Sequence, residues 1–179
     1  MSEDYYPPGA FYFTVKVLGT GTALAWLTDI DASFQEISGI QAEWDIEEVA
    51  EGGENRFVHR LPRPAKYSNL VMKRGIVTQS SLLSEWFGLS IGSAMTLPII
   101  PQNLLVMLLN DSGWPTNAWI FVNAYPLRWD AGPFNSLENR VMIETLEFSY
   151  NYFQRINLNV AGAAATAAAV SLAVARMAL

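Results

Sequence analysis

Runs of alternating apolar and polar residues, separated by turn signals, constrain the fold of this chain more than any other feature. Residues 11–17 (FYFTVKV) alternate at every second position, and residues 102–110, 117–129 and 139–153 are rich in branched and aromatic side chains. Such runs are typical of β-strands, and the Gly-, Pro- and Asn-containing segments between them predict turns. The pattern predicts a mostly antiparallel β domain of about six or seven strands.

Two of these runs support more detailed predictions. Residues 11–17 place Phe11, Phe13, Val15 and Val17 on one face and three polar or amphipathic residues on the other, which predicts a half-buried strand. In residues 139–153 the apolar positions change from odd numbers at Val141 and Ile143 to even numbers from Leu146 onward. A β-bulge near Glu144–Thr145 would account for this change of parity.

One segment of the main body has helical periodicity instead. In residues 79–88 the apolar side chains fall at i, i+1, i+4 and i+5, namely Leu82, Leu83, Trp86 and Phe87. Serines precede this run and Gly88 follows it, so we expect a short amphipathic helix. We expect one core to bury strand and helix residues together: Phe11, Phe13, Trp44, Ile46, Leu82 and Trp86.

The charges of residues 43–75 are sorted into an acidic half and a basic half. The acidic half is Glu43, Asp45, Glu47, Glu48, Glu51 and Glu54, and the basic half is Arg56, Arg60, Arg63, Lys66, Lys73 and Arg74, with the single histidine, His59. Residues 40–49 alternate, which predicts a strand whose acidic face lies in water and whose apolar face packs on the core. Residues 51–67 predict a long exposed loop, because Pro62 and Pro64 cannot donate into a sheet.

Composition excludes several classes of function. The chain has 179 residues, which fits one domain with an appendage. Its net charge of −6 argues against general nucleic-acid binding, and we expect no specific nucleic-acid binding either. It has no cysteine, so disulfides and zinc–thiolate sites are excluded. The first residues have neither a basic flank nor an apolar run, so we expect no signal peptide. Charged residues make up only 16% of the chain, which leaves room for buried subunit interfaces.

The sequence contains no convincing catalytic or metal-binding constellation. His59 stands alone in the expected loop, where a solvated or interface role is favoured over a catalytic one. The carboxylates of residues 40–49 lie on a strand face that we expect in water, without a flanking apolar pocket. We therefore predict no enzyme activity, no catalytic residue, no metal site and no cofactor.

The order of the segments resembles the inner tube proteins of contractile phage tails and phage-tail-like contractile injection systems. The resemblance covers residues 10–153 and is carried by Ser33-Phe34 through Ser38-Gly39, the Glu51-Gly52-Gly53 turn, residues 70–75 (LVMKRG), Ala124-Tyr125-Pro126 followed by Trp129, and Ile143-Glu144-Thr145-Leu146-Glu147. It implies a mainly β fold, with antiparallel sheets packed as a sandwich or half-barrel and one short flanking α-helix.

The resemblance also implies a function and a set of partners. Members of this family form hexameric rings that stack into a hollow tube inside a contractile sheath, and payload or DNA passes through the lumen. The implied partners are copies of the chain itself, sheath proteins, and baseplate or spike proteins. The implied location is the cytoplasm of the producing cell during assembly and then the tail or the extracellular particle. The family has no catalytic residues to carry over.

Sorted charges suit such an assembly, because ring contacts are heterologous and one patch can meet a different, oppositely charged patch on the neighbour. The candidate subunit-interface residues are Glu43, Asp45, Glu47, Glu48, Arg56, His59, Arg60, Arg63 and Lys66. Two other interpretations stay open. The bases pair with acids of the same subunit, or the acidic face of residues 40–49 lines the lumen.

Residues 161–179 differ in kind from the main domain, which we place at residues 1–160. This tail is rich in alanine, and its few polar residues are Thr166, Ser171 and Arg176. Membrane insertion is disfavoured, because spanning helices need about 20 strongly apolar residues. We expect a helix or an extended arm that docks on its own or a neighbouring subunit through its larger apolar residues: Val170, Leu172, Val174 and Met177.

A second class of function remains open, since the chain is 12% aromatic. Exposed aromatic residues on a monomeric β-sandwich can bind carbohydrate by stacking. Core or interface packing is the favoured role of these aromatic residues, because Trp44, Trp86 and Trp119 all fall on predicted apolar faces. Assembly into rings would distinguish the two functions.

Overall fold

The computed structural model describes residues 13–18, 34–53, 55–76, 82–93, 96–110, 112–133 and 141–157. This part of the chain forms nine strands and one helix: β1 (Phe13–Leu18), β2 (Phe34–Ser38), β3 (Ala42–Val49), β4 (His59–Tyr67), β5 (Leu70–Gly75), α1 (Leu82–Ser90), β6 (Gln102–Leu109), β7 (Pro115–Ala131), β8 (Ile143–Ser149) and β9 (Tyr152–Asn157). The predicted mainly β fold with one short helix is confirmed.

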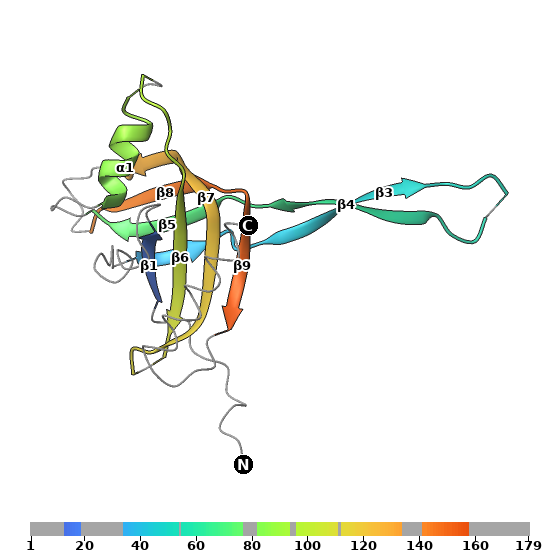
Figure 1. Ribbon diagram of the computed structural model, residues 1–179, viewed down its shortest axis with the longest axis horizontal. Coiled ribbons are helices and arrows are strands. Elements are labelled where there is room, and N and C mark those ends of the chain that lie inside the picture. The colour runs from blue at the N-terminus through green and yellow to red at the C-terminus, as the bar shows by residue number, and fades with distance from the viewer. Residues whose placement is uncertain are drawn as a thin grey trace, which may run out of the picture.

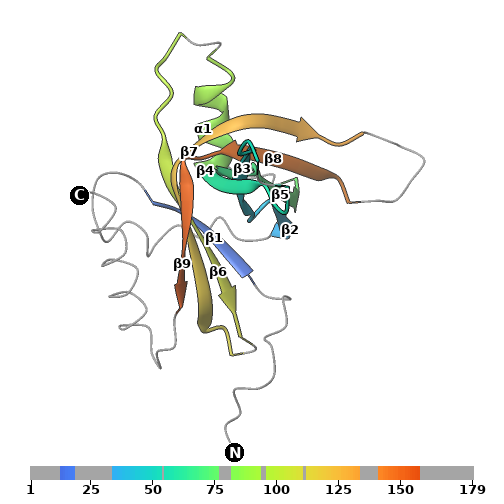
Figure 2. The same ribbon diagram turned by 90° about the vertical axis from the view of Figure 1, so that its right-hand side faces the viewer.

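The body consists of two antiparallel sheets that share the long strand β7. In sheet A the first half of β7 lies between β6 and β9, and β1 pairs with the outer side of β6. In sheet B the second half of β7 pairs with β8, followed by β5 and β2. Figure 2 shows β7 bending as it leaves sheet A and enters sheet B.

The bend in β7 has a local cause at Asn123. This residue has a positive φ of 53°, which asparagine tolerates better than most residues. Its N–H donates a hydrogen bond of 3.0 Å to Oδ1 of Asn103. The β6–β7 register shifts at the same place, between Gln102 and Leu104, so the Asn103 side chain supplies an acceptor where the regular ladder is interrupted.

One hydrophobic core joins both sheets and the helix. It contains Val15, Leu70, Met72, Leu83, Phe87, Leu104, Val106, Phe121, Ala124, Leu146, Phe148 and Tyr150. Within the described residues helix α1 spans Leu82–Ser90, and Gly88, which was expected to follow the helix, lies inside it. Leu83 and Phe87 are fully buried. Trp86 is partly buried, with its ring 5.5 Å from that of Phe148 and its Nε1–H donating to the Ile100 carbonyl at 3.1 Å.

Strand β1 is covered on both faces, so the prediction of a half-buried strand is wrong. Val15 belongs to the main core, yet Thr14 and Lys16 on the opposite face are each only 8% exposed. The alternation in residues 11–17 identified which side chains share a face, but it did not show that a second layer covers the polar face. Phe11 lies outside the described residues.

The predicted bulge near Glu144–Thr145 is also wrong. The β5–β8 register runs without a shift from Leu70–Phe148 to Gly75–Ile143. The even positions of β8 are buried throughout, and the first of them is Glu144, which is 3% exposed. A buried carboxylate therefore occupies the position where an apolar residue was expected. The strand then breaks at Tyr150–Asn151, and β9 continues from Tyr152.

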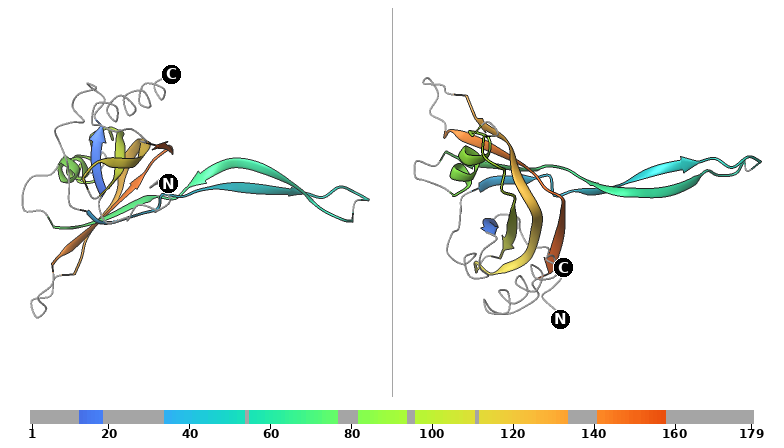
Figure 3. Two further views of the ribbon diagram at one scale, coloured as in Figure 1. Left: turned by 90° about the horizontal axis from the view of Figure 1, so that it is seen from below. Right: turned by 45° about the horizontal axis from the view of Figure 1, so that its top comes forward.

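The largest difference from the sequence prediction concerns residues 42–67. The expected loop over residues 51–67 contains strand β4, which pairs with β3 as a separate two-stranded sheet, the β3–β4 ribbon. The ribbon projects from the body (Figure 1), and the two further views agree (Figure 3). Pro62 and Pro64 are tolerated because each strand of a two-stranded ribbon has an unpaired edge.

The apolar residues expected to tie β3 to the core are instead exposed. Trp44 is 68% exposed and Ile46 is 52% exposed, so the core assignment of both residues is wrong. The predicted acidic face of the same strand does lie at the surface. Leu82 lies in α1 as predicted, but its side chain is outside the described residues.

Candidate assembly interface

The base of the ribbon is anchored in the body by a glycine and an aromatic residue. Gly39, between β2 and β3, has a φ of 87°, and a Cβ atom placed there would lie 1.9 Å from the carbonyl oxygen of Asn69. Only glycine allows the two segments of the chain that lead into the ribbon to approach this closely. Tyr67 at the end of β4 packs its ring 6.1 Å from Tyr150 and 5.7 Å from Phe153. The ribbon therefore projects from a base that is tightly packed against the body.

The register of the ribbon defines two chemically different faces. Residues directly opposite one another in an antiparallel pair share a face. Trp44 lies opposite Ala65 and Ile46 opposite Pro62, and these four residues form what we name the apolar ribbon face. The other face, the acidic ribbon face, carries Glu43, Asp45 and Glu47 on β3, with Lys66 and Leu61 on β4.

Three candidate bases pair with acids of the same ribbon. Lys66 Nζ lies 3.1 Å from Asp45 Oδ2, and Arg60 lies 3.2 Å from Glu48 Oε1. The hydrogen bond from Lys66 holds the pKa of Asp45 below its ordinary value. His59 Nε2 lies 3.5 Å from Glu51 Oε1, an ion pair when the imidazole is protonated. Within one chain, the intramolecular pairing that the sequence left open is therefore present for these three bases.

These exposed pairs contribute little to folding energy. Ion pairs in water are typically worth about 0–1 kcal/mol each. Their effect is on register, because acidic β3 and basic β4 attract each other along the ribbon and like-charged strands would not. The sorted charges thus have a local physical reason that the expectation of a loop had missed.

Three of the other candidate residues are available for contacts outside the subunit. Glu43, Glu47 and Arg63 form no ion pair with another residue in the described part of the chain. All three are exposed. Arg56 is exposed in the turn between the strands.

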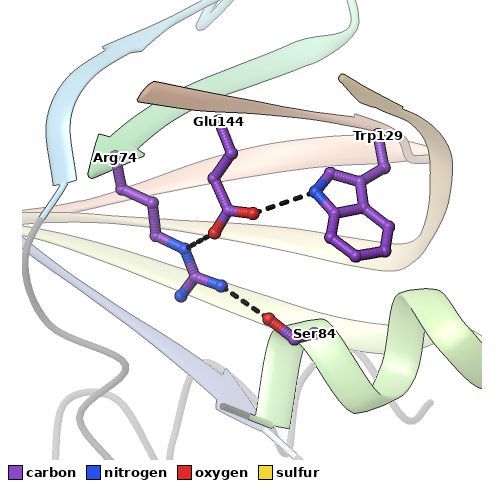
Figure 4. Close-up of polar contacts among 4 residues, drawn as sticks. All are labelled: Arg74, Ser84, Trp129 and Glu144. Carbon is purple, nitrogen blue, oxygen red and sulfur yellow. Dashed lines mark hydrogen bonds and ion pairs between the residues drawn. The ribbon is translucent and has the colours of Figure 1, made fainter. Parts of the chain in front are cut away.

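A buried polar cluster, which sequence reasoning missed, lies between helix α1 and the strands of the body (Figure 4). Arg74 on β5 and Glu144 on β8 are directly opposite in register, and Arg74 Nε donates to Glu144 Oε1. Arg74 also donates to Ser84 Oγ on α1 at 2.9 Å, and Trp129 Nε1 on β7 donates to Glu144 Oε2 at 2.9 Å. The cluster connects three strands and the helix.

This cluster removes Arg74 from the set of sorted surface charges. Arg74 is 1% exposed, and its guanidinium also lies over the Phe34 ring, 5.6 Å from the centroid. Buried ion pairs repay their desolvation only when further hydrogen bonds satisfy both groups, as Ser84 and Trp129 do here. Arg74, Trp129 and Glu144 all belong to segments that carried the family resemblance, so those segments meet in one place.

Two kinds of site are absent from the described residues. Within the described ranges, no group of three or more histidine, aspartate or glutamate side chains is placed to hold a metal ion. In the same part of the chain, no helix is both long and apolar enough to cross a membrane. The tail at residues 161–179 and its predicted docking lie outside these ranges.

Comparison with known proteins identifies a family and solved structures that are similar to this chain. Residues 9–154 match the protein family described as T4-like virus tail tube protein gp19. A chain in the cryo-EM structure of the anti-feeding prophage (AFP) baseplate, six-fold symmetrised, is 27% identical with a TM-score of 0.73, covering 89% of this chain and 100% of that chain. No curated protein matches the chain.

Two further solved structures share the fold at lower identity. A chain of the PVC sheath–tube complex, from an extracellular contractile injection system in the extended state, is 18% identical with a TM-score of 0.71, covering 87% of this chain and 95% of that chain. A chain of the AFP tube-terminating cap is 18% identical with a TM-score of 0.70, covering 85% of this chain and 92% of that chain.

Proposed function

This chain belongs to the T4-like virus tail tube protein family, and from that premise we propose that six copies form a ring and that rings stack into a hollow tube. The family resemblance predicted from residues 10–153 is confirmed by the match over residues 9–154. The chain is a structural tube subunit. The six-fold symmetry of the AFP baseplate, which contains a 27% identical chain, supports a ring of six.

The apolar ribbon face is the observation that carries this proposal. Isolated two-stranded ribbons are marginally stable in water, and contiguous exposed apolar surface marks an interaction site. Trp44 and Ile46 lie on a ribbon that projects away from its own body (Figure 1). In a ring or a stack of rings, every subunit lies next to another copy of itself, which can cover this face. The apolar ribbon face therefore docks on a neighbouring subunit.

The charges of the ribbon divide into two roles in this proposal. Asp45, Glu48, His59, Arg60 and Lys66 hold the ribbon in register through pairs within the subunit. Glu43, Glu47 and Arg63 face solvent in one chain and contact charges of opposite sign on the next subunit, with Arg56 in the adjoining turn. Such contacts set orientation and speed of association more than affinity.

The same relatives support the proposed partners and the proposed position in the particle. The tube lies inside a contractile sheath, on a baseplate and spike, and its lumen carries payload or DNA. The subunit is made in the cytoplasm and ends in the assembled particle.

Identity of 27% to a baseplate chain, against 18% to chains of a sheath–tube complex and a cap, favours a ring at the baseplate end. Quantitative mass spectrometry of purified particles is then expected to find as many copies of the chain per particle as a single ring contains. A copy number many times larger would place the chain along the whole tube.

The ribbon contact is tested by replacing its apolar face. Trp44→Ser with Ile46→Ser is expected to leave the subunit folded, because both side chains are exposed, and to abolish rings and tubes in negative-stain microscopy. Leu61→Ser is the matched control, since Leu61 is also 52% exposed but lies on the acidic ribbon face. Normal rings from the double variant would contradict the docking. Wild-type protein that stays monomeric and binds glycans would instead support the carbohydrate-binding alternative.

A further inference from the structure

Sheet A has a second buried face, on the side away from the main core. The residues of this second face are Thr14, Lys16, Leu18, Leu105, Met107, Ala118, Ile120 and Val122, and none is more than 8% exposed. Six of them form a separate hydrophobic cluster. Thr14 and Lys16 share the face because they lie opposite Met107 and Leu105. A face this deeply buried requires a covering layer.

The described part of the chain does not supply that layer. Its partly buried hydrophobic residues packed against the cluster are Leu109, Tyr152 and Ile156, all of which belong to sheet A itself. Helix α1 packs on the opposite side, because Leu83 and Phe87 belong to the main core. Burial also lowers the pKa of Lys16, which is consistent with a face from which water is excluded.

We propose that residues 161–179 cover the second face of sheet A in their own subunit. The chain reaches this segment from β9, which is the edge strand of sheet A beside β7 and ends at Asn157. Only three residues, 158–160, separate the end of that strand from the alanine-rich segment. The segment therefore starts at the border of the face that needs a cover.

The composition and length of the segment fit this face. Residues 161–179 contain no acid and one base, Arg176, so their burial costs little desolvation. Small alanine side chains allow close approach to a flat sheet, and Val170, Leu172, Val174 and Met177 add apolar area. A fully helical segment would be about 28 Å long, against about 14 Å across four strands spaced about 4.8 Å apart. The segment is long enough to cross the sheet.

Two other segments adjoin β1, the edge strand of sheet A: residues 19–33, which connect β1 to β2, and residues 1–12, which precede β1. Each carries two acids, Asp29 and Asp31 in the first and Glu3 and Asp4 in the second, whose burial would be costly. The absence of acids in residues 161–179 favours the alanine-rich tail as the cover.

Thiol protection tests the proposal directly, because the chain has no native cysteine. Met107→Cys places a thiol on the second face, and Val106→Cys places the matched control one residue away on the main-core face. Each is reacted with N-ethylmaleimide in unassembled full-length protein and in protein lacking residues 161–179. We expect the deletion to speed labelling of the cysteine at 107 by on the order of tenfold or more, with the cysteine at 106 unchanged.

Other outcomes overturn the proposal. A cysteine at 107 that stays protected after the deletion shows that another segment covers the face. Labelling that rises on dilution of the full-length protein shows that the tail of a neighbour covers it. The deletion could expose both cysteines by unfolding the subunit. In that case the same labelling is measured on full-length protein that carries Leu172→Asp and Val174→Asp. Faster labelling at 107 alone supports the tail as the cover, and unchanged labelling at 107 rejects it. These readouts need no ring formation, so they can fail while the proposed tube function holds.

Discussion

The body and the β3–β4 ribbon are built from the same kind of strand and end in opposite environments. In the body, Leu146 on β8 is 1% exposed, whereas Trp44 on β3 is 68% exposed. Both side chains stand on the apolar face of an alternating strand. Alternation thus identifies the residues that share a face, but the covering layer of that face comes from elsewhere in the fold or from another molecule.

Ion pairs show the same contrast. Arg74 and Glu144 form a pair in the body that is almost inaccessible to water, and Arg60 and Glu48 form a pair on the ribbon that is mostly exposed. Both pairs join residues directly opposite on antiparallel strands. The buried pair requires Ser84 and Trp129 to complete its hydrogen bonds, whereas water can complete those of the exposed pair. Loss of one partner should therefore have very different consequences in the two places.

The largest expected difference between body and ribbon is in aromatic truncation. Phe87→Ala should lower the free energy of unfolding by about 3–5 kcal/mol, because it leaves a cavity in a closed core. Trp44→Ala should change the stability of the unassembled subunit by less than about 1 kcal/mol. Urea denaturation of both variants checks this. Equal losses would mean that the ribbon packs on its own body.

The second comparison breaks one partner of each ion pair. Glu144→Gln should cost about 3 kcal/mol, since Arg74 would keep its buried charge without a carboxylate. Glu48→Gln should cost less than about 1 kcal/mol, because Arg60 can return to water. The double replacement Arg74→Met with Glu144→Leu should recover most of the stability lost in Glu144→Gln. A double variant as unstable as the single one would contradict the unpaired charge as the cause.

The third comparison concerns two glycines of positive φ at opposite ends of the ribbon. Gly39→Ala should cost about 2–3 kcal/mol, because the new Cβ atom meets the Asn69 carbonyl at the base. Gly53→Ala in the turn has a φ of 98° but meets nothing within 4 Å, and it should cost about 1 kcal/mol. Thermal unfolding distinguishes them. A larger loss at Gly53 would show that the base is more adaptable than its geometry indicates.

The fourth comparison separates charges that pair within the ribbon from those left for a neighbour. Exchanging Arg60 and Glu48 (Arg60→Glu with Glu48→Arg) should preserve the ribbon pair and assemble nearly as the wild type does. Arg63→Glu, alone or with Arg60→Glu, should weaken assembly, and added salt should weaken wild-type assembly in the same direction. Sedimentation at low and high salt measures both effects. Assembly of the Arg63→Glu variant at wild-type levels in low salt would remove Arg63 from the interface.

The smallest expected effect is a shift in one pKa on the ribbon. The hydrogen bond from Lys66 lowers the pKa of Asp45 below its ordinary value, so the stability from this pair is fully present at pH values above that ordinary pKa. It is lost as the pH falls through the lowered value. Lys66→Ala should raise the pKa of Asp45 toward its ordinary value, as measured by NMR titration. An unchanged pKa would show that the pair does not persist in solution.

Much of the fold could be predicted from the sequence because local patterns report local structure. The strands over 102–110 and 117–129 and the helix near 79–88 follow from the periodicity of neighbouring side chains, and the family followed from the order of short segments. The charge sorting drew attention to the segment that forms the ribbon, although the sequence predicted a loop over its second half. Its candidate residues remain proposals as interface contacts, and three of the bases are already paired within the chain.

Tertiary structure decided what periodicity could not report. Pro62 and Pro64 predicted a loop. They are compatible with strand β4 because β4 forms hydrogen bonds along one edge only, and its basic residues attract the acidic residues of β3 across the turn. Glu144 resembled a break in the pattern of β8 until Arg74, 70 residues earlier in the chain, completed its hydrogen bonds. Lys16 lies on a polar face of its strand and is buried all the same. In each case the sequence determined which side chains share a face, because alternation is a property of the strand itself. Burial was decided by the element that covers the face, which lies far along the chain or in another subunit.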